Sequence, residues 1–160
     1  MVWLRRRGRR GVTVRARCII RSGDGKILVQ WDPQRNSYIL PGGRVEFEES
    51  IPICLVREMK EEAGIEVRPR RLSYIVEVVE SSPPLHEIIF FIECDYQGTP
   101  RSLNRYVKLE WKDLEEVKDS LWPQPVAERL ANGGGEVYYI ALVDGSVRFI
   151  LPAKRREESA

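Results

Sequence analysis

Three glutamates within five residues are the side chains best suited to chemistry. Glu58, Glu61 and Glu62 stand at i, i+3 and i+4, so a helix would place all three on one face. Carboxylates at that spacing repel one another, and a bound cation would relieve the repulsion. The spacing therefore indicates either a cation site or a solvated acidic helix face.

The preceding residues add more negative than positive charge to this segment. The further carboxylates are Glu46, Glu48 and Glu49, and the nearby cations are Arg44, Arg57 and Lys60. Mg²⁺ and Mn²⁺ accept clusters of carboxylate oxygens, together with waters and substrate phosphates. We expect a divalent metal here, although three glutamates alone would be better explained as a solvated face.

A single helix of about 13 residues must carry these glutamates. Ser50 suits the N-cap, Pro52 is tolerated in the first turn, and Gly64 suits the C-terminal stop. The apolar stripe of this helix is Ile51, Leu55 and Met59. The segment before it contains Gly42 and Gly43, which allow a loop to approach a ligand closely.

Strand patterns surround this helix. The expected strands are 12–20 and 26–31, joined as a hairpin through the turn at 22–25, then 38–40, 65–79, 86–96 and 107–111. A second helix is expected at 123–131, followed by a closing hairpin over 137–151. Strands outnumber helices, and the two occur in mixed order along the chain.

A long spaced pattern links the loop and the helix. It has the form G-x5-E-x7-R-E-U-x-E-E-x-G-U, where U is apolar, and every defined position is matched. The matching residues are Gly43, Glu49, Arg57, Glu58, Met59, Glu61, Glu62, Gly64 and Ile65. This pattern resembles the Nudix box, the signature of the MutT-like Nudix hydrolases.

The resemblance implies a fold and a reaction. The fold would be an α/β/α sandwich with a mixed β-sheet. The activity would be Mg²⁺-dependent hydrolysis of a diphosphate bond in a nucleoside diphosphate linked to another group, with Mn²⁺ able to substitute. By position, the metal ligands would be Glu58, Glu61 and Glu62. Glu58 would also orient or deprotonate the attacking water, Arg57 would hold the carboxylates, and Glu49 would support the site.

Other residues are expected around the substrate. Gly42, Gly43, Arg44 and Glu110 are the candidate substrate-binding residues, and a metal ligand from outside the box could be Glu110, Glu77 or Glu87. The candidates for stacking on a base are Tyr38, Phe47, Trp111 and Trp122. Glu48 departs from the common form of the family, in which many members have glycine there.

Composition limits the remaining possibilities. The chain has 160 residues and a net charge of +2. No apolar run approaches the roughly 20 residues needed to span a bilayer, so no membrane association is expected. Cys18, Cys54 and Cys94 form no C-x-x-C pair, which favours free thiols and a cytoplasmic setting.

The chain divides into three expected parts. A basic, flexible arm covers 1–11, with five arginines in the first ten residues; a single Nudix domain covers 12–152, and a charged tail covers 153–160. The expected partner is a small nucleotide-type diphosphate substrate, and a homodimer is left open. Because of the basic arm, RNA 5′-end pyrophosphohydrolase activity is an alternative function. A non-catalytic nucleotide sensor is a further alternative.

Overall fold

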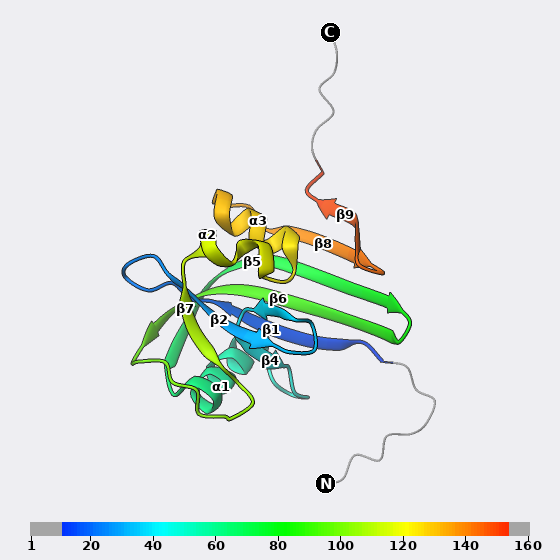
Figure 1. Ribbon diagram of the computed structural model, residues 1–160. Helices are drawn as coiled ribbons and strands as arrows, with labels where there is room; N and C mark the ends of the chain where they lie inside the picture. Colours follow the sequence, from blue (N-terminus) through cyan, green and yellow to red (C-terminus); the bar gives the residue numbers. More distant parts are fainter. Residues whose placement is uncertain (1–10, 154–160) are drawn as a thin grey trace.

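The computed structural model describes residues 11–153 as two β-sheets with helices around them (Figure 1). In chain order the elements are β1 (Thr13–Ile19), β2 (Ile27–Asp32), β3 (Ser37–Ile39), β4 (Gly42–Arg44), α1 (Ile51–Ala63), β5 (Glu66–Ser81), β6 (Pro84–Gln97), β7 (Leu109–Lys112), α2 (Leu114–Val117), the 3-10 helix η1 (Lys118–Ser120), α3 (Gln124–Asn132), β8 (Tyr138–Val143) and β9 (Ser146–Leu151). The expected arm at 1–11 and tail at 153–160 lie almost entirely outside the described residues.

The larger sheet is mixed. It has six strands in the order β4-β1-β6-β5-β8-β9. β1 runs parallel to β6 and β5 runs parallel to β8, whereas the other neighbours are antiparallel. The chain is therefore an α/β protein with a mixed sheet, as its sequence predicts.

The smaller sheet corrects one expectation. β2 pairs with β3 and β7 in a three-stranded sheet, so β1 and β2 do not form the regular hairpin predicted from their alternation. The turn itself is present, since Ser22 N donates to Lys26 O at 2.8 Å and Leu28 N donates to Ile20 O at 3.0 Å. Beyond it the two strands separate, because each already has two other partners.

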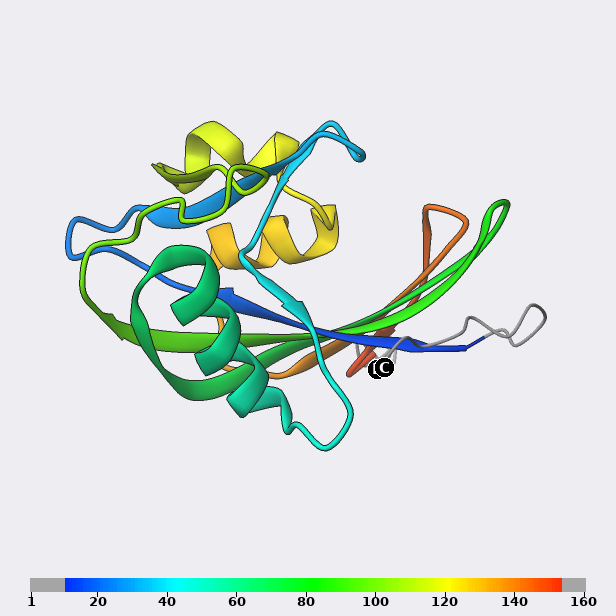
Figure 2. The same cartoon turned by 90° about the horizontal axis from the view of Figure 1, so that it is seen from below.

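The helices cover opposite faces of the six-stranded sheet (Figure 2). On one face, α1 contributes Leu55 and Met59 to a core with Ala16 and Cys18 of β1. On the other face, α2 and α3 pack over residues of β5, β6 and β8 such as Phe91. This is the α/β/α arrangement that the sequence predicts.

The ends of α1 follow from its capping residues. Ile53 N donates to the side chain of Ser50 at 3.4 Å, so Ser50 is the N-cap. Gly64 adopts a left-handed conformation with φ of 66° and ends the helix. Leu55 and Met59 are fully buried and Ile51 is half-buried, so the predicted apolar stripe faces the core. The opposite side of the helix is left to carry its charged residues.

Two elements were not expected from the sequence. Gly42 and Gly43 belong to β4, which pairs antiparallel with β1, rather than to a loop. A short helical segment at 114–120 also follows β7. None of the helices within 11–153 is long and apolar enough to cross a membrane.

Candidate active site

Arg57 on α1 lies at the centre of the carboxylate cluster. Its Nε and Nη2 donate to the two carboxylate oxygens of Glu49 at 2.6 and 2.9 Å. Its Nη1 donates to Glu58 at 2.9 Å and to Glu61 at 3.4 Å. A planar guanidinium is suited to such forked pairing. One cation therefore ties the loop before α1 to two of the glutamates on the helix.

These contacts set the charge states of Arg57 and Glu49. The hydrogen bonds from Arg57 lower the pKa of Glu49 to about 2, and the backbone N–H of Glu46 adds a further donor at 3.1 Å. In return, Glu49 raises the pKa of Arg57, with a smaller contribution from Glu58. Both Glu49 and Arg57 are therefore ionised at neutral pH.

The two glycines of β4 are required by close packing. A Cβ on Gly43 would lie 2.8 Å from Oε2 of Glu58 and closer still to its other carboxylate atoms. A Cβ on Gly42 would run into the carbonyl oxygen of Ala16. Glycine at these positions therefore lets β4 pair with β1 while the Glu58 carboxylate rests against the backbone.

Glu62 is the least satisfied of the carboxylates. Its Oε2 is buried and has no hydrogen-bond partner among the described residues. Burial, together with the neighbouring Glu58, raises the pKa of Glu62 to about 7. Glu61 differs, because 61% of its side chain is exposed. A buried carboxylate oxygen without a donor is costly unless a cation or a proton satisfies it.

The donor set fits a divalent cation, although the side chains do not form a closed cage. Within residues 11–153, no three His, Cys, Asp or Glu side chains converge closely enough to hold a metal by themselves. Mg²⁺ usually takes only one or two carboxylates and completes its shell with waters and substrate phosphates. Glu58 and the free oxygen of Glu62 are the pair that could serve such an ion.

Glu110 and Arg44, two further predicted residues, contribute no side chain to this cluster. Glu110 on β7 accepts from the Tyr38 hydroxyl at 3.5 Å and pairs with Lys112 at 3.4 Å. The side chain of Arg44 is exposed and reaches Thr13, while its carbonyl accepts from Arg57. Their roles toward a substrate stay predictions.

The two alternative carboxylates from outside the box have other partners. Glu77 accepts hydrogen bonds from Tyr139 at 2.5 Å and contacts His86 at 2.6 Å. Glu87 is only 4% exposed and accepts from Arg15 at 2.8 Å. Each is thus engaged by its own neighbours on the sheet.

The four aromatic candidates also differ in their surroundings. Phe47 is 90% exposed on the loop before α1. Trp111 is half-buried and packs against Tyr96, with ring centroids 5.6 Å apart. The guanidinium of Arg35 lies over the Trp122 ring, 4.0 Å from its centroid. The Tyr38 ring stands at 74° to the ring of Trp31, with centroids 5.0 Å apart. Of the four candidates, only Phe47 has a largely exposed side chain.

Three arginines near β1 were not predicted from the sequence. Arg15 and Arg17 alternate with buried Ala16 and Cys18 on β1, so their side chains emerge on the face opposite α1, and Arg35 lies in the segment between β2 and β3. The alternation was visible in the sequence. Their grouping was not, because Arg35 comes close only through the fold.

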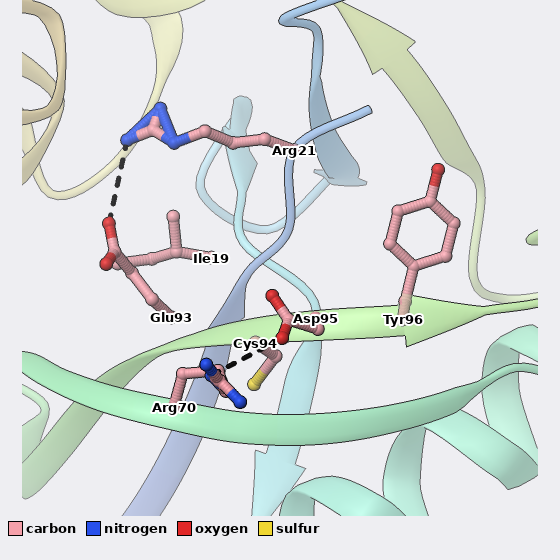
Figure 3. A pocket seen from close by; sticks show the side chains of 7 residues that line it. All are labelled: Ile19, Arg21, Arg70, Glu93, Cys94, Asp95 and Tyr96. Carbon is pink, nitrogen blue, oxygen red and sulfur yellow. Dashed lines mark ion pairs between the residues drawn. The ribbon is translucent and has the colours of Figure 1, made fainter. Parts of the chain in front are cut away.

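A separate cavity of about 410 Å³ contains no predicted site residue (Figure 3). Its lining residues are Ile19, Arg21, Arg70, Glu93, Cys94, Asp95 and Tyr96. Its charges are already paired, since Arg21 lies 4.0 Å from Glu93 and Arg70 lies 3.4 Å from Asp95. Balanced charges of this kind give a charged ligand little to compensate.

A mixed sheet carrying a helix with a central arginine and clustered glutamates defines a Nudix-type architecture. The family model described as the NUDIX domain matches residues 11–132. The chain belongs to the Nudix family. The crystal structure of the mutator MutT protein from Bacillus halodurans has the same fold, with a TM-score of 0.70 and 22% identity, covering 86% of this chain and 95% of that one.

Two proteins with similar sequences support membership of the Nudix hydrolases. The uncharacterized Nudix hydrolase YvcI of Bacillus subtilis is 26% identical over 106 residues, 64% of this chain and 66% of its own length. The prenyl-diphosphate phosphatase of Methanosarcina mazei is 31% identical over 117 residues, 67% of each chain. The chain therefore spans about two thirds of these relatives and is a member of a family of hydrolases.

Proposed function

We propose that the protein hydrolyses a diphosphate bond in a nucleoside diphosphate linked to another group, and that Mg²⁺ or Mn²⁺ is required. The observation that carries this proposal is the buried Oε2 of Glu62, which lacks a donor and lies beside a second carboxylate, Glu58. A divalent cation would satisfy both groups. Membership of the Nudix family supports cleavage of a pyrophosphate bond in general.

Three glutamates would hold the metal. Glu58 and Glu62 supply the inner pair, and the exposed Glu61 joins from the next turn of the helix. A divalent ion, when bound, neutralises phosphoryl oxygens and lowers the pKa of the attacking water. Carboxylate oxygens with no donor are the natural ligands for such an ion.

The remaining steps depend on the protein's own side chains. Glu58, whose Oε1 is fixed by Arg57, orients the attacking water and accepts its proton. Arg57 acts through the carboxylates rather than on the substrate, because its donors already serve Glu49, Glu58 and Glu61. Glu49 keeps Arg57 in this orientation.

Product release from a panel of substrates with and without Mg²⁺ tests the proposal. The panel contains a nucleoside triphosphate, a nucleotide sugar, a dinucleoside polyphosphate, a prenyl diphosphate and a 5′-triphosphorylated RNA. We expect turnover that excess chelator abolishes and that Glu58→Gln and Glu62→Gln each lower by about 10²-fold or more. Glu66→Gln, at an exposed position of β5, is the matched control.

Binding provides a second measurement that does not depend on turnover. Mg²⁺ should raise the Tm of the wild-type protein, and Glu62→Gln should reduce that shift. Full turnover in chelator would overturn the metal requirement. Metal-dependent nucleotide binding without product from any substrate would instead identify a sensor.

A further inference from the structure

Three guanidinium groups gather on the face of β1 that is opposite α1. We call Arg15, Arg17 and Arg35 the arginine cluster. Arg15 donates to the buried carboxylate of Glu87 at 2.8 Å, and Arg35 lies 3.9 Å from the same carboxylate. Arg35 also pairs with Asp32 at 3.2 Å. Among the described residues, the cluster therefore contains three guanidinium groups but only two carboxylates, Glu87 and Asp32.

Arg17 is the cation left without an ion-pair partner. In the part of the chain that the structure describes, no carboxylate oxygen lies within 4.0 Å of its guanidinium, and its partner is the carbonyl oxygen of Leu40 at 3.3 Å. Burial, followed by the positive charges of Arg15 and Arg35, lowers the pKa of Arg17 to about 10. A desolvated arginine in a structural role normally has a carboxylate partner.

The cluster is held in place before any ligand arrives. The guanidinium of Arg35 stacks on the Trp122 ring at 4.0 Å, and the Trp122 backbone N–H donates to the carbonyl of Tyr38 at 2.8 Å. Glu87 fixes Arg15 from beneath, with only 6% of its side chain exposed. Such preorganised donors bind an anion without a large loss of side-chain entropy.

The arginine cluster adjoins the carboxylate site through the strand ladder. Arg17 pairs directly with Gly42 of β4, and the next residue of β4, Gly43, supports Glu58. Glu62 also acts electrostatically on Arg17. Because β4 is the edge strand of the sheet, a phosphate chain held at the carboxylate site would reach the arginines on the other face by passing around β4.

A second cavity lies beside the arginine cluster. It has a volume of about 280 Å³ and is lined by apolar residues such as Trp122, Val78 and Leu142, and also by Glu80, Gln124 and Glu128, on the face of the sheet that carries the arginine cluster. Trp122 is shared between this cavity and Arg35. The surface therefore passes from carboxylates to guanidiniums and then to a wall that mixes apolar side chains with carboxylates.

We propose that Arg15, Arg17 and Arg35 bind a phosphate group of the substrate beyond the two joined by the scissile bond, so that nucleoside triphosphates are preferred over diphosphate diesters. The proposal rests on the function proposed above. Its physical basis is charge: the metal site neutralises the diphosphate under attack, and the arginine cluster retains one uncompensated positive charge for a further phosphate.

Arg17→Met tests this preference, with Arg71→Met as control. Arg71 is an exposed arginine on β5 that pairs with Glu93, and its loss removes the same charge elsewhere. For Arg17→Met we expect kcat/KM to fall at least about tenfold on a nucleoside triphosphate, mainly through KM, and less than about twofold on a nucleotide sugar and a prenyl diphosphate. Arg71→Met should leave all three unchanged.

A binding measurement separates this proposal from the proposed function. Inorganic tripolyphosphate is titrated into the wild-type protein in excess EDTA and followed by calorimetry. We expect binding that weakens with salt and is at least about tenfold weaker in Arg17→Met, while Arg17→Lys retains part of it. Circular dichroism and Tm confirm that each variant is folded.

The results distinguish a failure of the arginine-cluster proposal from a failure of the proposed hydrolase function. Equal losses of kcat/KM on all three substrates, or tripolyphosphate binding unchanged in a folded Arg17→Met protein, would overturn the role of the arginine cluster and leave the hydrolase in place. No metal-dependent turnover by the wild-type protein would overturn the proposed function, and the titration alone would then decide whether the arginines bind a phosphate chain.

Discussion

Two charged regions flank β1, and they are organised in opposite senses. On the α1 side, one arginine, Arg57, contacts several glutamates. On the other side, one buried glutamate, Glu87, contacts two arginines. In each region the ions of the minority sign position the majority. One side chain of each region, Glu62 or Arg17, has no ion-pair partner within 4.0 Å among the described residues, although the two act on each other at longer range.

The difference teaches what each region requires from a ligand. Surplus carboxylate oxygen calls for a cation, whereas a surplus guanidinium calls for an anion. A complex of a divalent metal with a polyphosphate carries both. The cavity of Figure 3 provides the contrast, because Arg21, Arg70, Glu93 and Asp95 neutralise one another there.

The strongest way to disturb only the carboxylate region is Gly43→Ala. The added methyl group collides with the Glu58 carboxylate, so kcat should fall about 10²-fold through misplacement of that group. Steady-state kinetics measure this effect, and tripolyphosphate binding in EDTA should be unchanged. Gly23→Ala, where an added Cβ meets nothing within 4 Å, is the control. Activity close to wild type would contradict the tight contact.

Removing the charge of Glu87 should have opposite effects on the stability of the protein and on anion binding by the arginine cluster. Glu87→Gln takes away the partner of Arg15 and should lower the free energy of unfolding by about 2 kcal/mol, measured by urea denaturation. The cluster becomes more positive, so tripolyphosphate should bind more tightly. Glu116→Gln on the exposed side of α2 should change neither quantity. Weaker anion binding would show that Glu87 shapes the cluster more than it neutralises it.

Replacing Arg57, the minority ion of the carboxylate region, should affect kcat rather than KM. Arg57→Lys keeps the charge but cannot hold both oxygens of Glu49 and also reach Glu58, so kcat should fall about tenfold with KM unchanged. Arg101→Lys at an exposed position serves as the comparison. A raised KM with normal kcat would instead make Arg57 a substrate ligand.

The smallest expected effect is a pH dependence of stability. The folded-state pKa of Glu49 is lowered to about 2 from 4.5, so its ion pair with Arg57 stabilises the protein fully above about pH 4.5. That contribution is lost as the pH falls toward 2. The difference in unfolding free energy between wild type and Glu49→Gln should therefore shrink below about pH 4.5. Glu46→Gln, whose glutamate is 66% exposed, should show almost no such trend.

The local features of the fold were predictable from the sequence. Ser50 and Gly64 delimit α1, and the 3.6-residue period of its apolar residues identifies the buried side. Sheet membership was not predictable in the same way. The turn at 22–25 indicates a hairpin, yet β1 and β2 enter different sheets, because long-range pairing with β6 and β7 determines where each strand lies.

The site residues also differ in how far they could be predicted from the sequence. Arg57, Glu58 and Glu62 are close in sequence, so helix geometry alone brings them together. Arg17 and Arg35 are distant in sequence, and their approach depends on how the segment between β2 and β3 folds over Trp122. A spacing pattern can identify the first group, whereas the second group requires the tertiary structure.

The pairing of β1 also constrains how this protein can change over time. β1 holds seven consecutive parallel partners on β6, from Thr13 opposite Glu87 to Ile19 opposite Glu93. Inserting or deleting one residue in β1 would reverse its faces, turning Arg15 and Arg17 into the core beneath α1 and Ala16 and Cys18 outward. Evolution can therefore change the ligand preference through β1 only by substituting residues at alternate positions of the strand. Alignments of diverged homologues should contain no gaps within β1.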